Sequence, residues 1–596
     1  MNPNPSPRTF GNEEHLPRVP VPALADTCRR FLEWSAPLLT ATQRARTEDA
    51  VAAFLAPQSP AHELQAALER YDARPDVGSW LDEFWPYRYL GRRDRIALNA
   101  NFFFLFHDSG QDQVERAATL VAAAVDYKLR LDDESVPPAV QRGRPLSMVQ
   151  NKFLFSTTRI PGAVQDTVRA PYSEEWPGPS TARHLVVFFR GTPFRLDVLD
   201  PDGRPYDRES LAAALHTIMK TGEVLADPAT AAGHLTTMAR AEWAGARQTL
   251  LADPGNAAAF EELETALFGL CLEDVSPADT QQACDGLLHG NSGNRWFDKS
   301  FSLVVFADGT AGINVEHCGL DGTTILSFVD IMLTAELDTA PAGPPAATGV
   351  PTATRIELTL DATLGRTARE AGESFAAYAD ATATRTVSFA DFGASRAKQL
   401  GMSPDAFVQM AYQLAHRRAK GLTGATYESI ATRQYRHGRT EAMRVVTPEV
   451  LTFVSTMDDD SADRAARSAA FRAAAAKHVA LAKECQAGDA PEQHLWELQL
   501  IAERAGATEP IALYESPGWL VMRDDYLSTS SAPSANIQYF GFGSTSPQCI
   551  GVAYVLLPDG LNIYLSTPRH VADQMHRFAE ELTTAVAELE DVLATG

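Results

Sequence analysis

One hairpin motif constrains this chain more than any other stretch of its sequence. Residues 301–306 form an apolar run typical of a buried strand, an Asp-Gly pair at 308–309 is a turn signal, and residues 312–316 predict the returning strand. His317 follows directly, so the hairpin would hold its imidazole at the end of a rigid element. The apolar, regularly spaced run 324–337 predicts a helix after it.

The residues around His317 suit general-base chemistry. Asp321 lies four residues further on, where its carboxylate could hold the imidazole directly or lock the loop that presents it. A histidine is a useful base when a partner fixes one ring nitrogen and the other faces the reacting group. Gly322 gives the turn conformational latitude. The motif alone is weak, because a hydrogen-bonded core histidine can have the same spacing by chance.

The sequence that flanks the hairpin is more specific. N-R-W-F-D-K-S at residues 294–300 precedes it, and E-H-x-x-x-D-G follows it. With the motifs described below, this arrangement resembles the choline/carnitine acyltransferase family over residues 16–566. The resemblance implies that His317 is the catalytic base, that Asp321 is its partner carboxylate and that Glu316 is the family's acid before the histidine.

Composition narrows the class of protein. The 596 residues are 45% hydrophobic and 21% charged, as in an ordinary globular protein. The net charge of −24 argues against a general nucleic-acid or anionic-membrane surface. A CoA site must therefore gather a local basic cluster against an unfavourable background. No apolar run approaches the length of a membrane span, so we expect neither nucleic acid nor membrane as a partner.

The six cysteines are widely scattered, with no metal-ligand spacing and no disulfide framework. We therefore expect no metal site and a reducing, cytoplasmic environment. The excess of Arg over Lys and the abundance of Ala favour a bacterial source. The resemblance implies a monomer without a bound cofactor, which uses acyl-CoA as a co-substrate together with a small-molecule acceptor.

Strands mixed with amphipathic helices predict an α/β (α+β) architecture. The resemblance implies two chloramphenicol acetyltransferase-like domains with the active-site tunnel at their interface. Residues 1–14 predict a disordered leader, and residues 340–351, rich in Pro, Gly, Ala and Thr, predict a linker. We place the N-terminal domain at 76–357 and the C-terminal domain at 358–596, and expect helices from residues 15–75 to pack on the latter.

A basic stretch after the linker implies the CoA site. A Ser-Pro pair before Asp405 predicts a helix start, because serine caps well and proline suits the first helical position. The resemblance places Lys398 on the CoA phosphates and Asp405 on pantetheine. The family's second phosphate lysine is replaced by Ala394, for which Arg396 could compensate. A solvated surface charge is the alternative interpretation of Lys398.

Two motifs, T-Y-E-S and H-G-R-T, imply the acceptor site. The family uses the tyrosine and a threonine thirteen residues later on carnitine's carboxylate, and Tyr427 and Thr440 match both. A further threonine of carnitine enzymes is replaced by Ala442. Gln493 stands where carnitine-using relatives have an arginine and choline-using relatives a neutral residue. Losing a charge-assisted hydrogen bond costs roughly 1.5–3 kcal/mol, so the sequence favours an acceptor without a carboxylate, although Thr440 is of the carnitine type.

Five further residues receive roles from the resemblance. Tyr89, in an aromatic-rich segment, would line the acceptor pocket, although a core position is the alternative. In L-S-T-S, Ser530 is the candidate oxyanion donor and Ser528 would lie near the acceptor's ammonium. Phe540 would face a trimethylammonium group, because aromatic rings attract desolvated cations. Gln538 aligns with the residue that limits acyl length, and its side chain predicts a short acyl group.

Two other matches carry less information. S-T-T-R-I-P-G at residues 156–162 contains Arg159, for which we favour a structural role over one near the site. Beyond Phe540, the family's D-G-Y-G loop is replaced by residues 547–551, which keep only the last glycine.

Together these residues predict a CoA-dependent O-acyltransferase. His317 would deprotonate the acceptor hydroxyl, the alkoxide would attack the thioester carbonyl, and Ser530 would support the oxyanion. We expect a short acyl group and a choline-like amino alcohol. Carnitine is the first alternative acceptor, and another alcohol or amine of specialised metabolism the second. A non-catalytic CoA-binding or scaffold protein is least favoured, because the catalytic set is intact.

Overall fold

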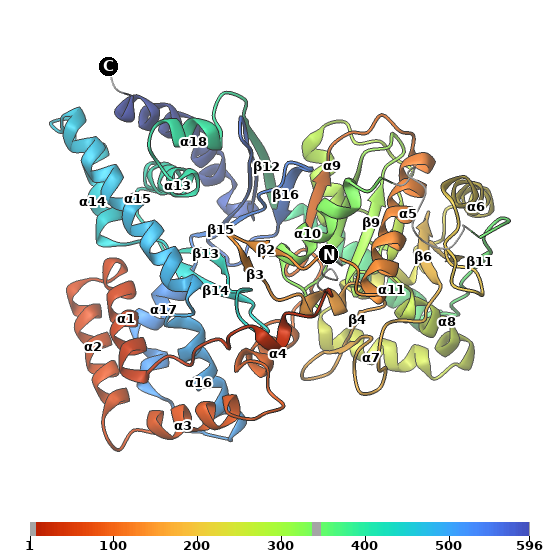
Figure 1. Ribbon diagram of the computed structural model, residues 1–596, viewed down its shortest axis with the longest axis horizontal. Coiled ribbons are helices and arrows are strands. Elements are labelled where there is room, and N and C mark those ends of the chain that lie inside the picture. The colour runs from red at the N-terminus through yellow and green to blue at the C-terminus, as the bar shows by residue number, and fades with distance from the viewer. Residues whose placement is uncertain (1–7, 337–346, 595–596) are drawn as a thin grey trace, which may run out of the picture. The chain divides into compact units, whose positions relative to one another are not determined.

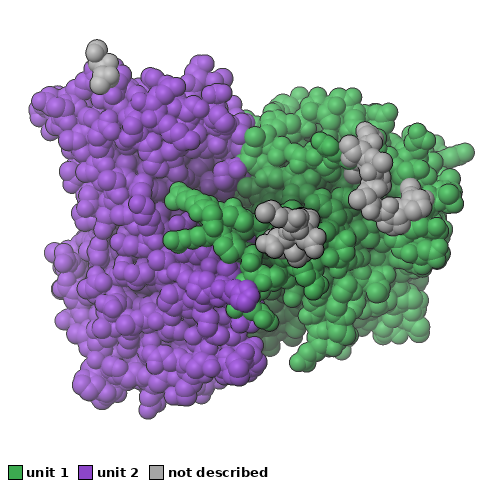
Figure 2. Space-filling model, viewed as in Figure 1, with its two compact units in different colours: residues 1–14, 85–382, 534–543 green, residues 15–84, 383–533, 544–596 purple. Residues whose placement is uncertain are grey.

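The computed structural model describes residues 8–336 and 347–594 (Figure 1). It has the predicted mixed α/β architecture, and the chain divides into two compact units (Figure 2). Each unit is built around one large sheet, of eight strands in unit 1 and six in unit 2. Unit 1 comprises Met1–Glu14, Trp85–Thr382 and Ser534–Gly543, and unit 2 comprises His15–Phe84, Ala383–Pro533 and Ser544–Gly596.

The unit 1 sheet has a parallel centre, β6-β8-β9, and antiparallel strands on both sides. Its inner strands are buried along their whole length and therefore read as continuous apolar runs. The last strand comes from the far end of the chain and pairs with β1. In order across the sheet, the strands are β11 (Ala353–Arg355), β7 (Thr192–Asp197), β6 (His184–Phe189), β8 (Gly269–Leu272), β9 (Phe301–Val305), β10 (Ala311–Val315), β1 (Phe102–Phe106) and β16 (Ile537–Phe542).

Helices cover both faces of this sheet. On one face, Phe301 packs on Phe328 of α10, with ring centroids 5.2 Å apart. On the other, Asn314 donates to the carbonyl of Leu287 in α9 at 2.7 Å. The helices of unit 1 are α5 (Gln113–Asp132), α6 (Arg208–Thr221), α7 (Arg240–Leu251), α8 (Pro254–Thr265), α9 (Thr280–Leu288), α10 (Gly322–Leu333) and α11 (Ala362–Asp380); short strands are β2 (Val140–Gln141), β3 (Arg144–Pro145), β4 (Thr158–Ile160) and β5 (Thr167–Arg169).

The unit 2 sheet also has a parallel centre, β13-β15-β17. One face is covered by α13, from which Gln409 and Gln413 donate to Thr529 and Thr426 at 2.9 and 3.1 Å. Across the sheet, the strands are β12 (Thr382–Phe389), β18 (Leu561–Pro568), β17 (Ile550–Leu556), β15 (Leu527–Ser531), β13 (Thr426–Ala431) and β14 (Thr440–Arg444).

The helices of unit 2 come from both ends of the chain. Thr27 and Gln65 from the first helices both hydrogen-bond the ring of His494 in α16, at 2.8 and 2.9 Å. The helices are α1 (Leu24–Ser35), α2 (Ala41–Leu55), α3 (Ala61–Asp72), α12 (Ala394–Gln399), α13 (Pro404–Lys420), α14 (Pro448–Met457), α15 (Arg464–Gln486), α16 (Glu492–Arg504), α17 (Pro517–Arg523) and α18 (Ala572–Leu593), with α4 (Leu81–Leu90) where the chain passes into unit 1.

The units differ from the expected domain ranges. The first boundary falls between residues 84 and 85, the second between 382 and 383, and residues 534–543 belong to unit 1. The leader prediction is wrong for residues 8–14, because Thr9 is buried and its hydroxyl donates to the carbonyl of Val136 at 2.7 Å. Residues 1–7 of the leader and 340–346 of the expected linker lie outside the described residues.

The hairpin prediction is confirmed. β9 and β10 pair antiparallel, with Val315 opposite Phe301. Gly309 turns the chain with φ at +87°, a conformation that glycine adopts without strain. The following helix, α10, begins at Gly322 and ends at Leu333, earlier than expected. In the part of the chain that the structure describes, no helix combines the length and the apolar character needed to cross a membrane.

Candidate active site

The imidazole of His317 leaves the end of β10 with its orientation fixed. Its Nδ1 lies 2.9 Å from the carbonyl oxygen of Leu320. A carbonyl oxygen only accepts hydrogen bonds, so Nδ1 carries the proton and Nε2 is the basic nitrogen of the neutral ring. The ring stacks on Tyr89, with centroids 4.5 Å and planes 24° apart, and packs against Phe102 at 5.0 Å. This arrangement orients the imidazole in the way that the predicted role of general base requires.

The carboxylate of Asp321 is buried and fixes the loop that follows His317. Its Oδ2 accepts a hydrogen bond from Gln150 Nε2 at 2.9 Å, and its Oδ1 accepts one from Trp85 Nε1 at 3.4 Å. The same glutamine accepts from the Asp321 backbone N–H at 2.8 Å. These contacts lock the loop that presents His317, which is one of the two roles that the sequence allowed for Asp321. Gln150 carries no sequence signal that would have singled it out.

The loop itself depends on one glycine. Gly319 has φ at +102°, and a Cβ there would lie 2.7 Å from the ring of Phe153. A side chain at this position would therefore strain the backbone and clash, displacing the segment between His317 and Asp321.

The acid before the histidine is paired. Glu316 is buried, and its Oε1 accepts from Arg159 Nη1 at 2.7 Å. Arg159 also donates to Asp166 at 2.6 Å. Burial alone would raise the pKa of Asp166, but the charges of Arg240 and Arg159 together hold it below its usual value. Arg159 thus lies in a buried ion-pair network and reaches the residue next to His317, so its contacts are compatible with both roles that the sequence analysis considered.

Two other predicted residues of unit 1 lie on β16. Phe540 packs against Phe104 and Phe102, with ring centroids 5.4 and 6.2 Å apart, and is only 6% exposed. Gln538 lies where the pairing shifts register, between the partners of Leu105 and Phe106. It is therefore the extra residue of a β-bulge, a feature that re-aims side chains near binding sites. The cation contact of Phe540 stays a prediction.

Strand register in unit 2 gathers the predicted acceptor and oxyanion residues on one face of its sheet. Tyr427 of β13 pairs with Ser528 of β15, and the register of β13 with β14 puts Thr440 on the same side. Alternate residues of a strand share a face, so Ser530 joins them and Thr529 points to the opposite face. That opposite face is the one covered by α13, where Gln409 donates to Thr529.

The hydroxyl groups on the two faces differ in whether they hydrogen-bond other parts of the protein. Thr529 is buried, accepts from Gln409 and donates to the Tyr427 carbonyl at 2.8 Å. The side-chain hydroxyls of Ser528, Ser530 and Thr440 have no hydrogen-bond partner within residues 8–336 and 347–594. They are therefore available to a ligand without first breaking a protein contact.

Gln493 is fully buried and turned toward its own sheet. Its Nε2 donates to the Thr440 carbonyl at 2.6 Å. The nearby guanidinium of Arg444, which the sequence analysis missed, lies 5.6 Å from the ring centroid of Tyr427. It is held by Glu492, at 2.7 Å, and by Asp525. Burial would lower the pKa of Arg444, but these two carboxylates raise it above its usual value. The arginine is thus charged and neutralised within the protein.

The two cations predicted to bind CoA differ in whether they have an ion-pair partner. Lys398 is exposed and has no ion pair among the described residues. Arg396, expected to compensate for Ala394, is instead paired with Glu590 of α18 at 2.6 Å. The structure adds Arg472 of α15, whose guanidinium lies 3.4 Å from the carbonyl of Leu400, at the turn after α12. The structure therefore brings a cation from a distant helix to the end of the stretch that contains Lys398.

Asp405 belongs to a buried polar cluster. Its Oδ1 accepts from the hydroxyl of Tyr554 at 2.7 Å, and His478 Nε2 lies 2.8 Å from Glu428 Oε2. Burial and then the neighbouring Asp405 raise the pKa of Glu428 to about 7, against the effect of His478. Ligand atoms of Asp405, Glu428 and His478 lie within 4.8 Å of one another, close enough to hold a metal ion. Hydrogen bonds already link His478 to Glu428 and Asp405 to Tyr554, while Nδ1 of His478 is buried without a hydrogen-bond partner in the described part of the chain.

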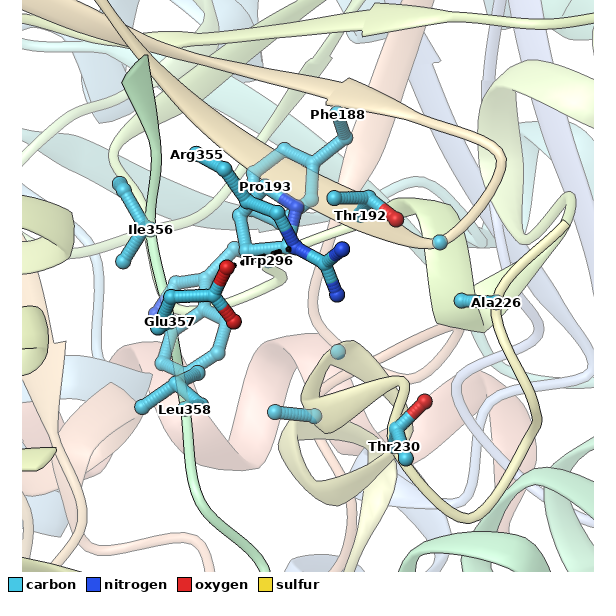
Figure 3. Close-up of a pocket in the computed structure, with 13 residues that line it drawn as sticks. Phe188, Thr192, Pro193, Ala226, Thr230, Trp296, Arg355, Ile356, Glu357 and Leu358 are labelled. Atoms are coloured by element: carbon cyan, nitrogen blue, oxygen red, sulfur yellow. Dashed lines mark ion pairs between the residues drawn. The ribbon is translucent and has the colours of Figure 1, made fainter. Parts of the chain in front are cut away.

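A pocket of about 250 Å³ lies elsewhere in unit 1 (Figure 3). Phe188, Thr192 and Trp296 line it, and Arg355 pairs with Glu357 at its edge at 3.2 Å. None of its lining residues is a predicted site residue. The predicted site residues lie instead around His317 in unit 1 and on one face of the unit 2 sheet. That they meet in a tunnel between the domains stays a prediction.

The chain is similar to known proteins along nearly its whole length. A family model described as choline/carnitine O-acyltransferase matches residues 19–584. Carnitine O-palmitoyltransferase 2, mitochondrial, of Rattus norvegicus is 31% identical over 613 residues, covering 95% of this chain and 91% of the relative. Carnitine O-acetyltransferase of Homo sapiens is 28% identical over 609 residues, covering 99% of this chain and 95% of the relative.

Proposed function

Because the chain belongs to the choline/carnitine O-acyltransferase family and is an acyl-CoA-dependent acyltransferase, we propose that it transfers a short acyl group to the hydroxyl of a choline-like amino alcohol. The observation that carries the choice of acceptor is the position of Gln493. Its amide donates to the Thr440 carbonyl and brings no positive charge to this part of unit 2.

The proposed reaction is a direct transfer with His317 as the base. Nε2 of the imidazole takes the proton of the acceptor hydroxyl, and the oxygen attacks the thioester carbonyl. The hydroxyl of Ser530, which has no partner among the described residues, donates to the oxyanion as it forms. The C–S bond then breaks, and the CoA thiolate leaves and takes the proton back from the imidazolium. In reverse, the same base deprotonates the CoA thiol.

The acceptor assignment rests on charge. A carnitine carboxylate bound near Gln493 would need a cation, and the nearby Arg444 is already held by two carboxylates. Losing a charge-assisted hydrogen bond costs roughly 1.5–3 kcal/mol, which is about 10- to 150-fold in affinity. Carnitine is the alternative, supported by Thr440 and by the names of the relatives, both of which are carnitine acyltransferases.

The proposed short acyl group rests on Gln538. One relative is named for palmitoyl and another for acetyl transfer, at nearly equal identity, so the relatives do not distinguish acyl length. Gln538 occupies the bulge of β16, and we propose that its side chain shortens the acyl pocket. A Gln538→Gly variant should then accept palmitoyl-CoA better than the wild-type protein does, relative to acetyl-CoA.

The experiment that tests the proposal is thiol release from acetyl-CoA, with choline and L-carnitine in parallel. We expect release with choline and little with carnitine. In a Gln493→Arg variant, kcat/KM for carnitine should rise about tenfold or more relative to choline. Gln493→Asn is the matched control, because it changes the side chain without adding charge. Efficient transfer to carnitine by the wild-type protein would contradict the choice of acceptor.

We also propose a monomer located in the cytoplasm. The six cysteines are all buried as free thiols, which suits a reducing compartment. Light scattering of the purified protein and fractionation of the source cells test the two statements separately.

A further inference from the structure

We infer that Arg159 is a positioning residue for the catalytic histidine, because its guanidinium holds both the strand end that carries His317 and the backbone of Tyr89, whose ring stacks on the imidazole. The inference rests on the proposed role of His317 as the base. Arg159 itself need not touch the substrate.

All three nitrogens of the Arg159 guanidinium group are used. Nη1 donates to Glu316 Oε1 at 2.7 Å, and Glu316 is the residue directly before His317. Nη2 donates to the backbone carbonyl of Tyr89 at 2.9 Å, and the ring of Tyr89 stacks on the imidazole. Nε donates to Asp166 Oδ2 at 2.6 Å. One rigid, planar group therefore sets the relative position of the histidine's backbone and its stacking partner.

Arg159 is itself held by a buried network of alternating charge. Asp166 also accepts from Arg240 at 2.6 Å and from Arg93 at 2.9 Å. Arg240 in turn lies 2.8 Å from Asp298. The side chains of Arg159, Asp166 and Arg240 are fully buried. Counting Glu316, the network contains three guanidinium groups and three carboxylates. Each buried charge therefore has a partner of opposite sign.

These contacts complete the restraint of the imidazole. The bond from Nδ1 to Leu320 sets the rotation of the ring, as described above. Through Glu316, Arg159 also fixes the position of the chain next to His317. Through the Tyr89 carbonyl, it fixes the backbone of the residue that stacks on the imidazole. Displacing a reacting group by about 1 Å can cost about 10²-fold in rate. The network therefore has a role in the chemistry beyond stabilising the fold.

A second buried ion pair in unit 1 serves as a control, because it can stabilise the fold without positioning His317. Arg295 and Glu273 also form a buried ion pair, and their side chains are 2% and 6% exposed. The hydrogen bonds of Arg295 go to Glu273, Asn294 and Gly286, none of which is near His317 or Tyr89 in sequence. A lysine in place of either arginine keeps the charge and loses the planar fork.

The first experiment compares Arg159→Lys with Arg295→Lys, using the acceptor that proves active. Both variants should lose thermal stability. We expect kcat to fall about 10²-fold for Arg159→Lys, with KM for acyl-CoA unchanged, and kcat to stay near the wild-type value for Arg295→Lys. Equal kcat values in the two variants would overturn the inference.

The second experiment separates charge from geometry in the pH profile of kcat/KM. Among the described residues of unit 1, charged groups close to His317 in the chain are Glu316 and Asp321. Arg159 of β4 pairs with Glu316, and Arg88 of α4 lies over the Tyr89 ring that stacks on the imidazole. Glu316→Gln removes a negative charge, so the acid limb should move to lower pH. Arg159→Gln leaves Glu316 uncompensated, so the limb should move to higher pH. Shifts in the same direction, or none, would argue against the inference.

A third readout needs no known acceptor. In the NMR spectrum of histidine-labelled protein, the His317 signals are identified by their loss in His317→Ala. They should move in Arg159→Lys and stay in Arg295→Lys, and an unmoved spectrum in both would overturn the inference even if Arg159→Gln does not fold. Full acyl transfer by His317→Ala would instead sink the proposed function, so the two failures are distinguishable.

Discussion

The surroundings of His317 in unit 1 and the hydroxyl-bearing face of the unit 2 sheet use their polar groups in opposite ways. Around His317, the ring Nδ1, the Asp321 carboxylate and the Arg159 guanidinium are all hydrogen-bonded inside the protein. On the unit 2 face, the hydroxyls of Ser528 and Ser530 have no partner in the described part of the chain.

The difference distinguishes polar groups that the protein already holds in place from polar groups that can still bond a ligand. A base must be held in one position before the substrate arrives, because reorganising it would slow every turnover. A donor that stabilises a developing charge should instead be unbonded before the substrate arrives. If it were bonded to the protein, that bond would have to break first. The same contrast separates Thr529, which is bonded into its sheet, from the serines on either side of it.

The largest effect that tests this contrast is expected at the base. His317→Ala should lower kcat for thiol release by about 10²–10⁴-fold, the usual contribution of a general base. His234→Asn is the control, because His234 is another partly buried histidine of unit 1, bonded to Ser292 at 2.8 Å. Its kcat should stay near wild type. Comparable losses in both variants would mean that any histidine loss damages unit 1.

The next effect distinguishes the unused hydroxyl from the used one. Ser530→Ala should lower kcat by about 10²–10³-fold and leave the free energy of unfolding nearly unchanged, because no protein partner is lost. Thr529→Val should lower the free energy of unfolding by about 1–3 kcal/mol, because Gln409 loses one of its two buried acceptors, the other being the Tyr554 hydroxyl. Kinetics and urea unfolding of both variants test this expectation. A Ser530→Ala variant that loses stability and keeps its kcat would contradict it.

A smaller effect is expected at the exposed lysine of the CoA stretch. Lys398→Ala should raise KM for acetyl-CoA by up to about fivefold, since an exposed charge contributes about 0.2–1 kcal/mol. The effect should shrink as salt is added. Lys483→Ala, an exposed lysine of α15, serves as control. If both variants have the same KM, Lys398 is an ordinary surface charge.

The last effect concerns stability and pH, not the rate of the reaction. The pKa of Glu428 is raised from 4.5 to about 7, so its contribution to stability is fully present below about pH 4.5 and lost as the pH rises to about 7. Glu428→Gln stays neutral throughout. The free energy of unfolding should therefore fall more steeply over this window in the wild-type protein than in the variant. Parallel curves would contradict the raised pKa.

Sequence patterns predicted those parts of the molecule that depend on neighbouring residues. The hairpin, its Asp-Gly turn and the helix after His317 follow from hydrophobic spacing and turn chemistry, and each is present. The Ser-Pro start at residue 403 is also the observed start of α13. The end of the predicted leader was less predictable, because Thr9 hydrogen-bonds Glu134 and Val136, more than a hundred residues away.

By itself, the sequence determined the local elements, the candidate base and its family. Only the tertiary structure decided which polar groups are paired. It joined Arg159 to Glu316 across 157 positions and committed Arg396 to Glu590 across 194. It also made Gln538 a bulge residue, through the pairing of β16 with β1. Backbone preferences act over a few residues, whereas a buried charge takes the partner that the packed chain brings within hydrogen-bond reach.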